Sequence, residues 1–159
     1  MGDPRPGEIL LPFDPADRGD AQVHFIGTIR SPWTKDTCPK NIGRARETGQ
    51  PALIELRKDF GIGLQGLAIG QPIVLLYWMD QADRNIILQR PRHTDGPRGV
   101  FALRSPARPN PIAMCTVRIT SLDAEAGQIG IDAIDVFDGT PLVDLKPWLE
   151  TVDIPPAPA

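Results

Sequence analysis

The sequence predicts a mainly β fold: a compact β-barrel-type domain with few short helices. Short runs of apolar and β-branched residues recur along the chain, and turn signals built on glycine, proline and aspartate separate them. Helical periodicity is scarce, because only residues 59–68 and 146–150 are compatible with short helices. At 159 residues the chain is long enough to bury the core of one domain.

The predicted strands are, in order, residues 23–30, 52–57, 72–79, 84–89, 112–122 and 128–137. The run 72–79 is apolar throughout, which is typical of a strand buried on both faces, and we expect 84–89 to return beside it. The link 123–127 is short enough to join the last two strands in a hairpin. Asp138-Gly139 is a turn signal that ends the series.

The ends of the chain differ in composition from its middle. Residues 1–20 contain four prolines among scattered charges, and they predict an irregular N-terminal arm. Residues 154–159 predict a similar irregular tail, which leaves 21–153 as the barrel domain. No run of apolar residues is long enough for a membrane span, and the N-terminus lacks a signal-peptide pattern. We therefore expect a protein without a membrane partner.

Cysteine and histidine are too sparse to indicate a metal site. Cys38 and Cys115 are the only cysteines, and without a secretory signal they are typical of the reducing cytoplasm. His24 and His93 are isolated from any partner at metal-ligand spacing. The sequence therefore predicts a cytoplasmic protein without a bound metal.

Charge is distributed unevenly along the chain. Residues 84–108 contain six arginines and one aspartate, a net charge of +5, whereas the whole chain carries −3. A basic segment on an acidic protein is typical of binding to a polyanion or a phosphate. A solvated surface loop explains the same charges without any ligand.

The most distinctive segment is the proline-rich run 99–111, Gly-Val-Phe-Ala-Leu-Arg-Ser-Pro-Ala-Arg-Pro-Asn-Pro. It begins like a buried strand, but its three prolines lack backbone donors and keep the residues before them out of the helical conformation. Arg104 and Arg108 lie within it. A stiff loop that holds guanidinium groups suits recognition of an anion.

Residues 61–66, Gly-Ile-Gly-Leu-Gln-Gly, match the dinucleotide-binding pattern G-x-G-x-x-G. A Rossmann site also needs a helix directly after this pattern, and Gly70 and Pro72 end any such helix almost at once. We therefore interpret these glycines as a tight chain reversal, and the predicted fold is not of the Rossmann class.

Four segments, in this order, resemble the TsaA-like/TrmO family: residues 25–32, 89–92, 99–111 and 135–148, the last reading Asp-Val-Phe-Asp-Gly-Thr-Pro-Leu-Val-Asp-Leu-Lys-Pro-Trp. Members of that family are S-adenosylmethionine (SAM) dependent tRNA methyltransferases. The resemblance implies a non-Rossmann, β-barrel-type homodimer with SAM near the subunit interface. It also implies methylation of N6 of threonylcarbamoyladenosine, next to the anticodon of a threonine tRNA.

The resemblance implies a set of SAM contacts that includes Arg104, whose guanidinium could pair with the carboxylate of SAM or with a phosphate of the substrate. The chain has Asp80 where the family often has histidine, and Ala113 where it has glycine. The implied contacts are Asn41, Ile42, Gly43, Arg44, Asp80, Gln81, Arg104, Met114, Asp132, Ala133, Ile134 and Asp135.

Methyl transfer from a sulfonium is a direct displacement, so the protein chiefly aligns the reactants. A carboxylate such as Asp138 is the candidate base for the N6 proton, although a turn aspartate that bonds its own backbone explains the same residue. Arg90, Arg92 and Arg108 are the candidates for contacts to RNA phosphates or to the threonyl carboxylate of the substrate.

Two other functions remain open from the sequence. The chain ends soon after the last motif, without room for the further C-terminal domain that many members carry. A module that binds SAM or another nucleotide as a sensor, without acting on RNA, is one alternative. Methylation of a different small substrate that contains adenine is the other.

Overall fold

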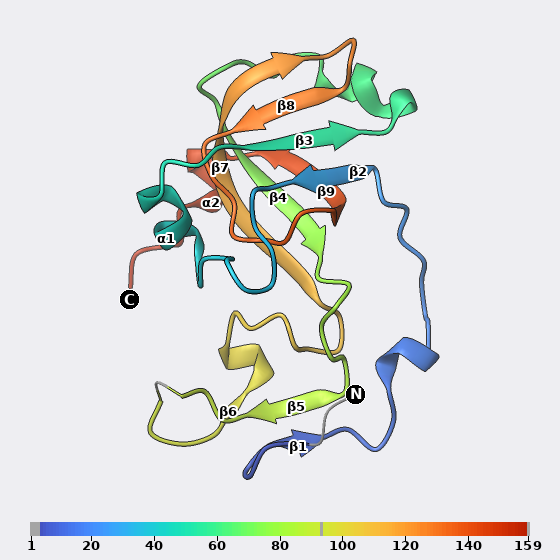
Figure 1. Ribbon diagram of the computed structural model, residues 1–159, viewed down its shortest axis with the longest axis vertical. Coiled ribbons are helices and arrows are strands. Elements are labelled where there is room, and N and C mark those ends of the chain that lie inside the picture. The colour runs from blue at the N-terminus through green and yellow to red at the C-terminus, as the bar shows by residue number, and fades with distance from the viewer. Residues whose placement is uncertain (1–3, 93, 159) are drawn as a thin grey trace. The chain divides into compact units, whose positions relative to one another are not determined.

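The computed structural model describes residues 4–92 and 94–158, which fall into two units (Figure 1). The barrel unit comprises residues 24–77 and 114–158, and the arginine-loop unit comprises residues 4–23 and 78–113. Both units are built mainly from strands and loops, which confirms the predicted fold class.

Six strands close into a barrel in the order β2-β3-β8-β7-β4-β9. They are β2 (Gly27–Arg30), β3 (Ala52–Leu56), β4 (Pro72–Trp78), β7 (Ile112–Asp123), β8 (Gln128–Ile131) and β9 (Thr140–Pro147). The pairs whose register is defined are antiparallel. Closure leaves no exposed strand edge in this sheet, and Figure 1 shows β3, β2 and β9 lying next to one another.

The core lies inside the barrel and follows the two-residue period of its strands. Ile54 on β3, Ile73 and Leu75 on β4 and Ile129 on β8 are all 0% exposed. The prediction that β4 is buried on both faces is wrong, because its buried residues alternate with half-buried ones. A closed barrel has one interior, so the outward side chains of an apolar strand are covered only in part.

The predicted pairing of residues 84–89 with the preceding strand is also wrong. In the barrel β4 is bonded to β9 and β7, whereas β5 (Ile86–Gln89) pairs with β1 (Ile9–Leu10) and β6 (Arg98–Gly99) in the arginine-loop unit. A turn does follow β4, with the Ala82 N–H bonded to the carbonyl of Met79 at 3.0 Å, but β5 then joins β1 and β6 rather than β4.

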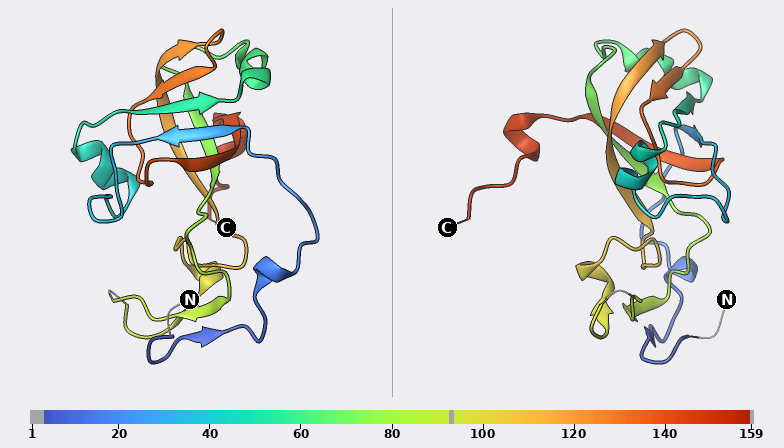
Figure 2. Two further views of the ribbon diagram at one scale, coloured as in Figure 1. Left: turned by 45° about the vertical axis from the view of Figure 1, so that its right-hand side comes forward. Right: turned by 60° about the vertical axis from the view of Figure 1, so that its left-hand side comes forward.

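The short helices differ from those predicted. The range 59–68 contains a 3-10 helix, η2 (Lys58–Leu64), and the predicted helix over 146–150 is wrong, because β9 continues to Pro147. The helices α1 (Ile42–Glu47) and α2 (Glu150–Asp153) were not predicted. Figure 2 shows α2 leading away from the barrel that β9 helps to close.

The glycine-rich segment after β3 is a chain reversal, as predicted. Gly66 and Gly70 have φ of 96° and 89°, a region that residues with a Cβ rarely adopt. Gly61 is required for close packing, because an added Cβ would lie 2.6 Å from the carbonyl oxygen of Ala124. The predicted hairpin over residues 123–127 is confirmed, since it joins the paired strands β7 and β8.

The N-terminal arm contributes an ordered strand to the arginine-loop unit. It contains β1 and a 3-10 turn, η1 (Pro15–Asp17). The carboxylate of Glu8 accepts bonds from the backbone and the side chain of Arg5, at 3.0 and 2.6 Å, and from the backbone of Arg90. The side chain of Glu8 is only 4% exposed, so this cluster fastens the arm to the end of β5.

Acid is expected to release the arm. The hydrogen bond from the Arg5 side chain lowers the pKa of Glu8 below its ordinary value of 4.5. A lowered pKa in the folded state contributes stability that is complete above the ordinary value and is lost as the pH falls through the lowered one. The protection factor of the Leu11 amide, which bonds the carbonyl of Asn85, should therefore fall below about pH 4 in hydrogen exchange. Glu8→Gln should show a low protection factor at every pH, and an acid-dependent loss of protection kept by that variant would contradict Glu8 as its source.

Candidate functional site

The arginine-loop unit takes its name from the loop of residues 99–111. Hydrogen bonds donated by side chains hold this loop in place. After β6 the loop makes one 3-10 turn, η3 (Val100–Ala102), and no further regular structure, so Gly99 alone belongs to the strand-like beginning predicted there. Arg108 donates through Nη2 to the carbonyls of Val100 and Leu103. Three prolines remove backbone donors from this loop, so its carbonyls are satisfied by side chains instead.

Two residues outside the loop complete this arrangement. Gln89 donates through Nε2 to the carbonyl of Ala107 at 2.7 Å, and Arg84 donates through Nε to the carbonyl of Pro109 at 2.7 Å. The guanidinium of Arg84 also lies over the ring of Trp78, 5.3 Å from its centroid. Arg84 and Arg108 therefore support the loop, while other arginines of the basic segment remain exposed.

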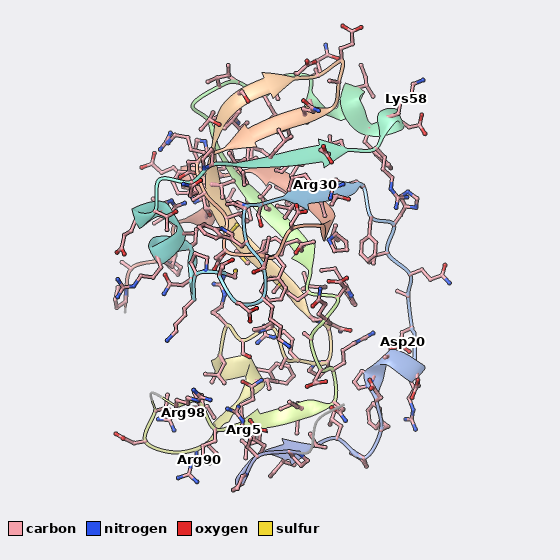
Figure 3. The ribbon with its side chains drawn as sticks, viewed as in Figure 1. Arg5, Asp20, Arg30, Lys58, Arg90 and Arg98 are labelled. Carbon is pink, nitrogen blue, oxygen red and sulfur yellow. The ribbon has the colours of Figure 1, made fainter. Side chains whose placement is uncertain are left out.

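The other candidates of this unit are exposed. Arg104 lies on the loop between the carbonyls that Arg108 and Gln89 hold, while Asp80 and Gln81 lie in the turn that follows β4. Arg90 and Arg92 are exposed after β5, and Figure 3 shows Arg90 at the sheet that β5 and β6 form. Among the predicted phosphate contacts, Arg108 differs from Arg90 and Arg92 because its Nη2 bonds two carbonyls of the loop.

In the barrel unit the predicted segment 41–44 is the start of α1. Asn41 is the N-cap residue, and its side-chain oxygen accepts a bond from the backbone of Arg44 at 2.9 Å. The side chain of Arg44 is exposed and pairs with Glu47 at 3.0 Å. The cap explains why an asparagine stands here, since asparagine is among the favoured residues at a helix N-cap.

Asp132 joins α1 to the barrel. Its carboxylate accepts from Arg46 Nε at 3.0 Å and from the backbone of Arg118 at 2.7 Å, while Arg46 also donates to the carbonyl of Thr116. Arg46 and Arg118 line a small cavity of about 160 Å³ with Asp132. Arg46 could not be singled out from the sequence, because the helix α1 that places it beside Asp132 was not predicted.

The segment 133–135 is buried or half-buried, and Trp33 covers part of its backbone. Ala133 and Ile134 are 0% exposed, and the carbonyl of Ile134 accepts a bond from the indole of Trp33 at 2.7 Å. Asp135 is half-buried, and it adds to the larger effect of burial that raises the pKa of both cysteine thiols. Met114, at the start of β7 in this unit, is 46% exposed. The structure thus gathers α1 and residues 132–135 in one region of the barrel unit.

Asp138 lies in the turn that precedes β9. One carboxylate oxygen accepts a bond from the backbone of Ser31 at 3.2 Å, and the other lies 3.8 Å from Arg30 Nη1. The backbone of Asp138 donates to the carbonyl of Trp33 at 2.9 Å. The side chain remains 54% exposed, so it fastens the loop 31–33 while keeping a surface open to a ligand.

The two thiols are not poised as nucleophiles. Burial, with a smaller contribution from Asp135, raises the pKa of Cys38 to about 11, and burial raises that of Cys115 to about 12. Both thiols are therefore protonated at neutral pH, and a thiol is a far weaker nucleophile than a thiolate.

Within residues 4–92 and 94–158, no group of three or more metal-ligating side chains is assembled. His24 lies beside Arg57, 3.3 Å from its Nη1, and His93 lies outside the described residues. No helix in the described part of the chain is long and apolar enough to cross a membrane.

A closed antiparallel barrel without a βαβ unit in its described part, joined to a loop stiffened by arginines, defines a β-barrel protein of non-Rossmann type. The family model described as the tRNA-methyltransferase O N-terminal domain matches residues 28–154, and the chain belongs to this family. The N-terminal arm, residues 1–20, precedes the match.

Curated relatives and solved structures agree with this assignment. A probable S-adenosyl-L-methionine-binding protein of Archaeoglobus fulgidus is 37% identical over 83% of this chain and 35% of its own length. The probable S-adenosyl-L-methionine-binding protein VirR of Rhizobium radiobacter is 33% identical over 82% of this chain and 73% of its own length. A crystal structure of TrmO is similar with a TM-score of 0.68 and 30% identity, over 85% of this chain and 60% of that one.

The structure of TrmO from Pseudomonas aeruginosa is similar with a TM-score of 0.64 and 28% identity, over 85% of this chain and 58% of that one. The chain thus spans about a third of the Archaeoglobus relative and about three fifths of the TrmO chains.

Proposed function

We propose that this chain binds SAM and transfers its methyl group to N6 of threonylcarbamoyladenosine, beside the anticodon of a threonine tRNA in the cytoplasm. The observation that carries the proposal is the family match over residues 28–154, supported by the likeness to TrmO structures. The names of several curated relatives support SAM as the ligand.

The donor set fits this cofactor. SAM presents a carboxylate, an ammonium and ribose hydroxyls, which call for a cation, an anion and backbone groups. Arg104 offers an exposed guanidinium on a loop whose neighbouring carbonyls are already bonded. Because the loop is already ordered, binding of SAM costs little further conformational entropy. Asp80 is an exposed carboxylate suited to the ammonium or the hydroxyls, and Met114 offers apolar contact.

The remaining proposed contacts come from the segments 41–44 and 132–135. Ala133 and Ile134 are 0% exposed, so the accessible part of these segments is that of Asn41, Arg44, Asp132 and Asp135. We infer that the active form is a homodimer with the cofactor near the subunit interface. Sedimentation of the protein with and without SAM tests this, and a monomer at working concentration with full activity would contradict it.

When bound, the cofactor supplies an electrophilic methyl group on a sulfonium. The residues of this chain then have to hold the accepting nitrogen in line and remove its proton as the new bond forms. Asp138 is the proposed base, because its exposed carboxylate keeps lone pairs beyond the bond from Ser31. Arg90 and Arg92 are proposed to hold phosphates of the RNA or the threonyl carboxylate.

Asp138→Asn separates the two roles of this residue. Asparagine keeps an oxygen for the Ser31 bond but has no useful basicity, so the rate of methyl transfer is expected to fall roughly 100- to 10,000-fold while SAM affinity is unchanged. Single-turnover transfer to tRNA and calorimetry with SAM measure the two quantities. If the variant transfers the methyl group as fast as the parent chain, Asp138 is not the base and has only its structural role in the turn.

The assay that tests the function itself uses methyl-labelled SAM and total tRNA, with and without the threonylcarbamoyl modification. Label in the modified pool alone is the expected result. SAM binding without any acceptor would favour a sensor module, a candidate that the names of the binding-protein relatives support. Label only in small molecules of a cell extract would favour a small adenine-containing substrate.

A further inference from the structure

A pocket of about 340 Å³ lies in the arginine-loop unit between the N-terminal arm, β5 and the loop. Its volume is within the range of small-ligand sites, about 300–1,000 Å³. The arm supplies Arg5 and Glu8, β5 supplies Gln89, and the loop supplies Ser105. None of the SAM or phosphate contacts proposed above lines this pocket, and its arm side precedes the family match.

The polar groups of the pocket suit a neutral ligand with its own donors and acceptors. Gln89 is only 7% exposed, and its bond to Ala107 fixes which end of the amide faces the loop. Its Oε1 accepts no hydrogen bond from the described part of the chain, so it is available to a ligand. Glu8 and Asp83 also line the pocket, and two carboxylates disfavour an anion there. Side-chain amides pair well with nucleobases, and with adenine in particular.

Arginines surround the same pocket. Arg98 lies directly opposite Gln89 in the β5–β6 pair, and residues opposite each other in a sheet share a face. Arg90 follows Gln89 and lies against the arm, since a Cβ on Gly7 would be 3.5 Å from its Cδ. Figure 3 shows Arg5, Arg90 and Arg98 around this small sheet. Cations beside an amide-lined pocket match a nucleotide within a polyanion better than a free base.

We propose that this pocket, the arm pocket, takes an unpaired adenine of the RNA, with Arg90 and Arg98 on the neighbouring phosphates. The inference rests on RNA as the acceptor in the proposed function. It assigns a role to the N-terminal arm, which closes one wall of the pocket and places Arg5 at it. The adenine of SAM has the same chemistry, so the experiment must separate the two sources.

The test is a cycle between protein and RNA. Binding of a synthetic anticodon stem-loop is measured with the parent chain and with Gln89→Leu, using the intact RNA and RNAs that each lack one loop base. One abasic RNA is expected to bind the parent chain about 10- to 100-fold more weakly. Gln89→Leu should weaken binding of the intact RNA by a similar factor, and its affinity should not fall further when that abasic RNA replaces the intact one. If the effects of the substitution and of the missing base on affinity instead multiply, the proposal is overturned.

Two further variants guard this result. Gln65→Leu makes the same change at an exposed glutamine of the barrel unit and should bind every RNA like the parent chain. Ser105→Val alters the pocket without touching the bond to Ala107, and it replaces Gln89→Leu if the latter melts early. Arg98→Ala should reduce the salt dependence of binding by about one phosphate contact, whereas Lys58→Ala on the barrel unit should not.

The remaining outcomes distinguish the sources and the function. Affinity for S-adenosylhomocysteine is expected to be equal in the parent chain and in Ser105→Val, which keeps the bond between Gln89 and Ala107 that orders the Arg104 loop. A loss of that affinity with RNA binding intact would assign the pocket to the cofactor's adenine instead. If the protein methylates tRNA but Gln89→Leu binds RNA like the parent chain, the role of the arm pocket is overturned while the proposed function stands. If the losses from Gln89→Leu and from the abasic RNA do not multiply but no tRNA is methylated, the proposed function alone is overturned.

Discussion

Arg104→Ala is expected to weaken SAM binding roughly 10- to 100-fold while the protein remains folded, since one charge-assisted hydrogen bond contributes about 1.5–3 kcal/mol. Arg104 lies on a loop whose carbonyls on either side, those of Leu103 and Ala107, are held by Arg108 and Gln89. The guanidinium is therefore presented from a backbone that is already ordered. Calorimetry with SAM measures the loss.

The matched control for this prediction is Arg98→Ala, which removes another exposed arginine of the same unit. It should leave SAM affinity unchanged, which separates a specific contact from the general loss of one positive charge. An Arg104→Ala variant that binds SAM like the parent chain would remove Arg104 from the cofactor site. Equal losses in both variants would indicate long-range electrostatics rather than a contact.

Gly27→Ala is expected to destabilise the barrel by about 2–3 kcal/mol, the upper part of the range for overpacking a core. Gly27 pairs with Leu56 on β3 and with Leu142 on β9, so it sits between two bonded neighbours. An added Cβ would overlap the carbonyl oxygen of Glu55 and lie 3.0 Å from Leu56 Cα. Both atoms belong to backbone, so relief requires the strands to move apart.

Thermal unfolding measures this cost, with an expected fall in Tm of roughly 5–10 °C for a chain of this size. Gly63→Ala is the control, because its added Cβ meets nothing within 4 Å and its φ is ordinary. That variant should lie within about 0.5 kcal/mol of the parent chain. If both glycines tolerate alanine equally, the packing of β2 against β3 is looser than described.

The strands that could be predicted are those whose own residues alternate or run apolar. β3, β4 and β7 were predicted nearly at their observed bounds, because burial of one face requires a regular pattern. The partners of a strand carry no such local signal. Residues 84–89 were predicted beside β4, yet β5 pairs with β6 and with the arm strand β1, which was not predicted. Strand β9 was missed because its motif resembled a turn followed by a helix.

The candidate site divides in the same way. Motif resemblance predicted Asn41 and Asp132 as ligand contacts, but the bonds that Asn41 makes as the cap of α1 and that Asp132 makes with Arg46 depend on elements distant in the sequence. Asp138 was weighed as a turn residue from the sequence, and its bond to Ser31 adds a contact across 107 positions of the chain. Such contacts leave no periodicity, so only the folded chain reveals them.

The sequence by itself determined the class of fold, the family and the stiff loop, because strand periodicity, motif order and proline chemistry are local properties. It also indicated an anion-binding role for the arginines of residues 84–108. Only the tertiary structure decided which of them face inward: Arg84 and Arg108 bond loop carbonyls, while Arg90, Arg98 and Arg104 are exposed. The physical reason is that prolines have no backbone N–H, so the carbonyls of this loop need side-chain donors as partners. Which arginine reaches those carbonyls depends on how the loop folds back.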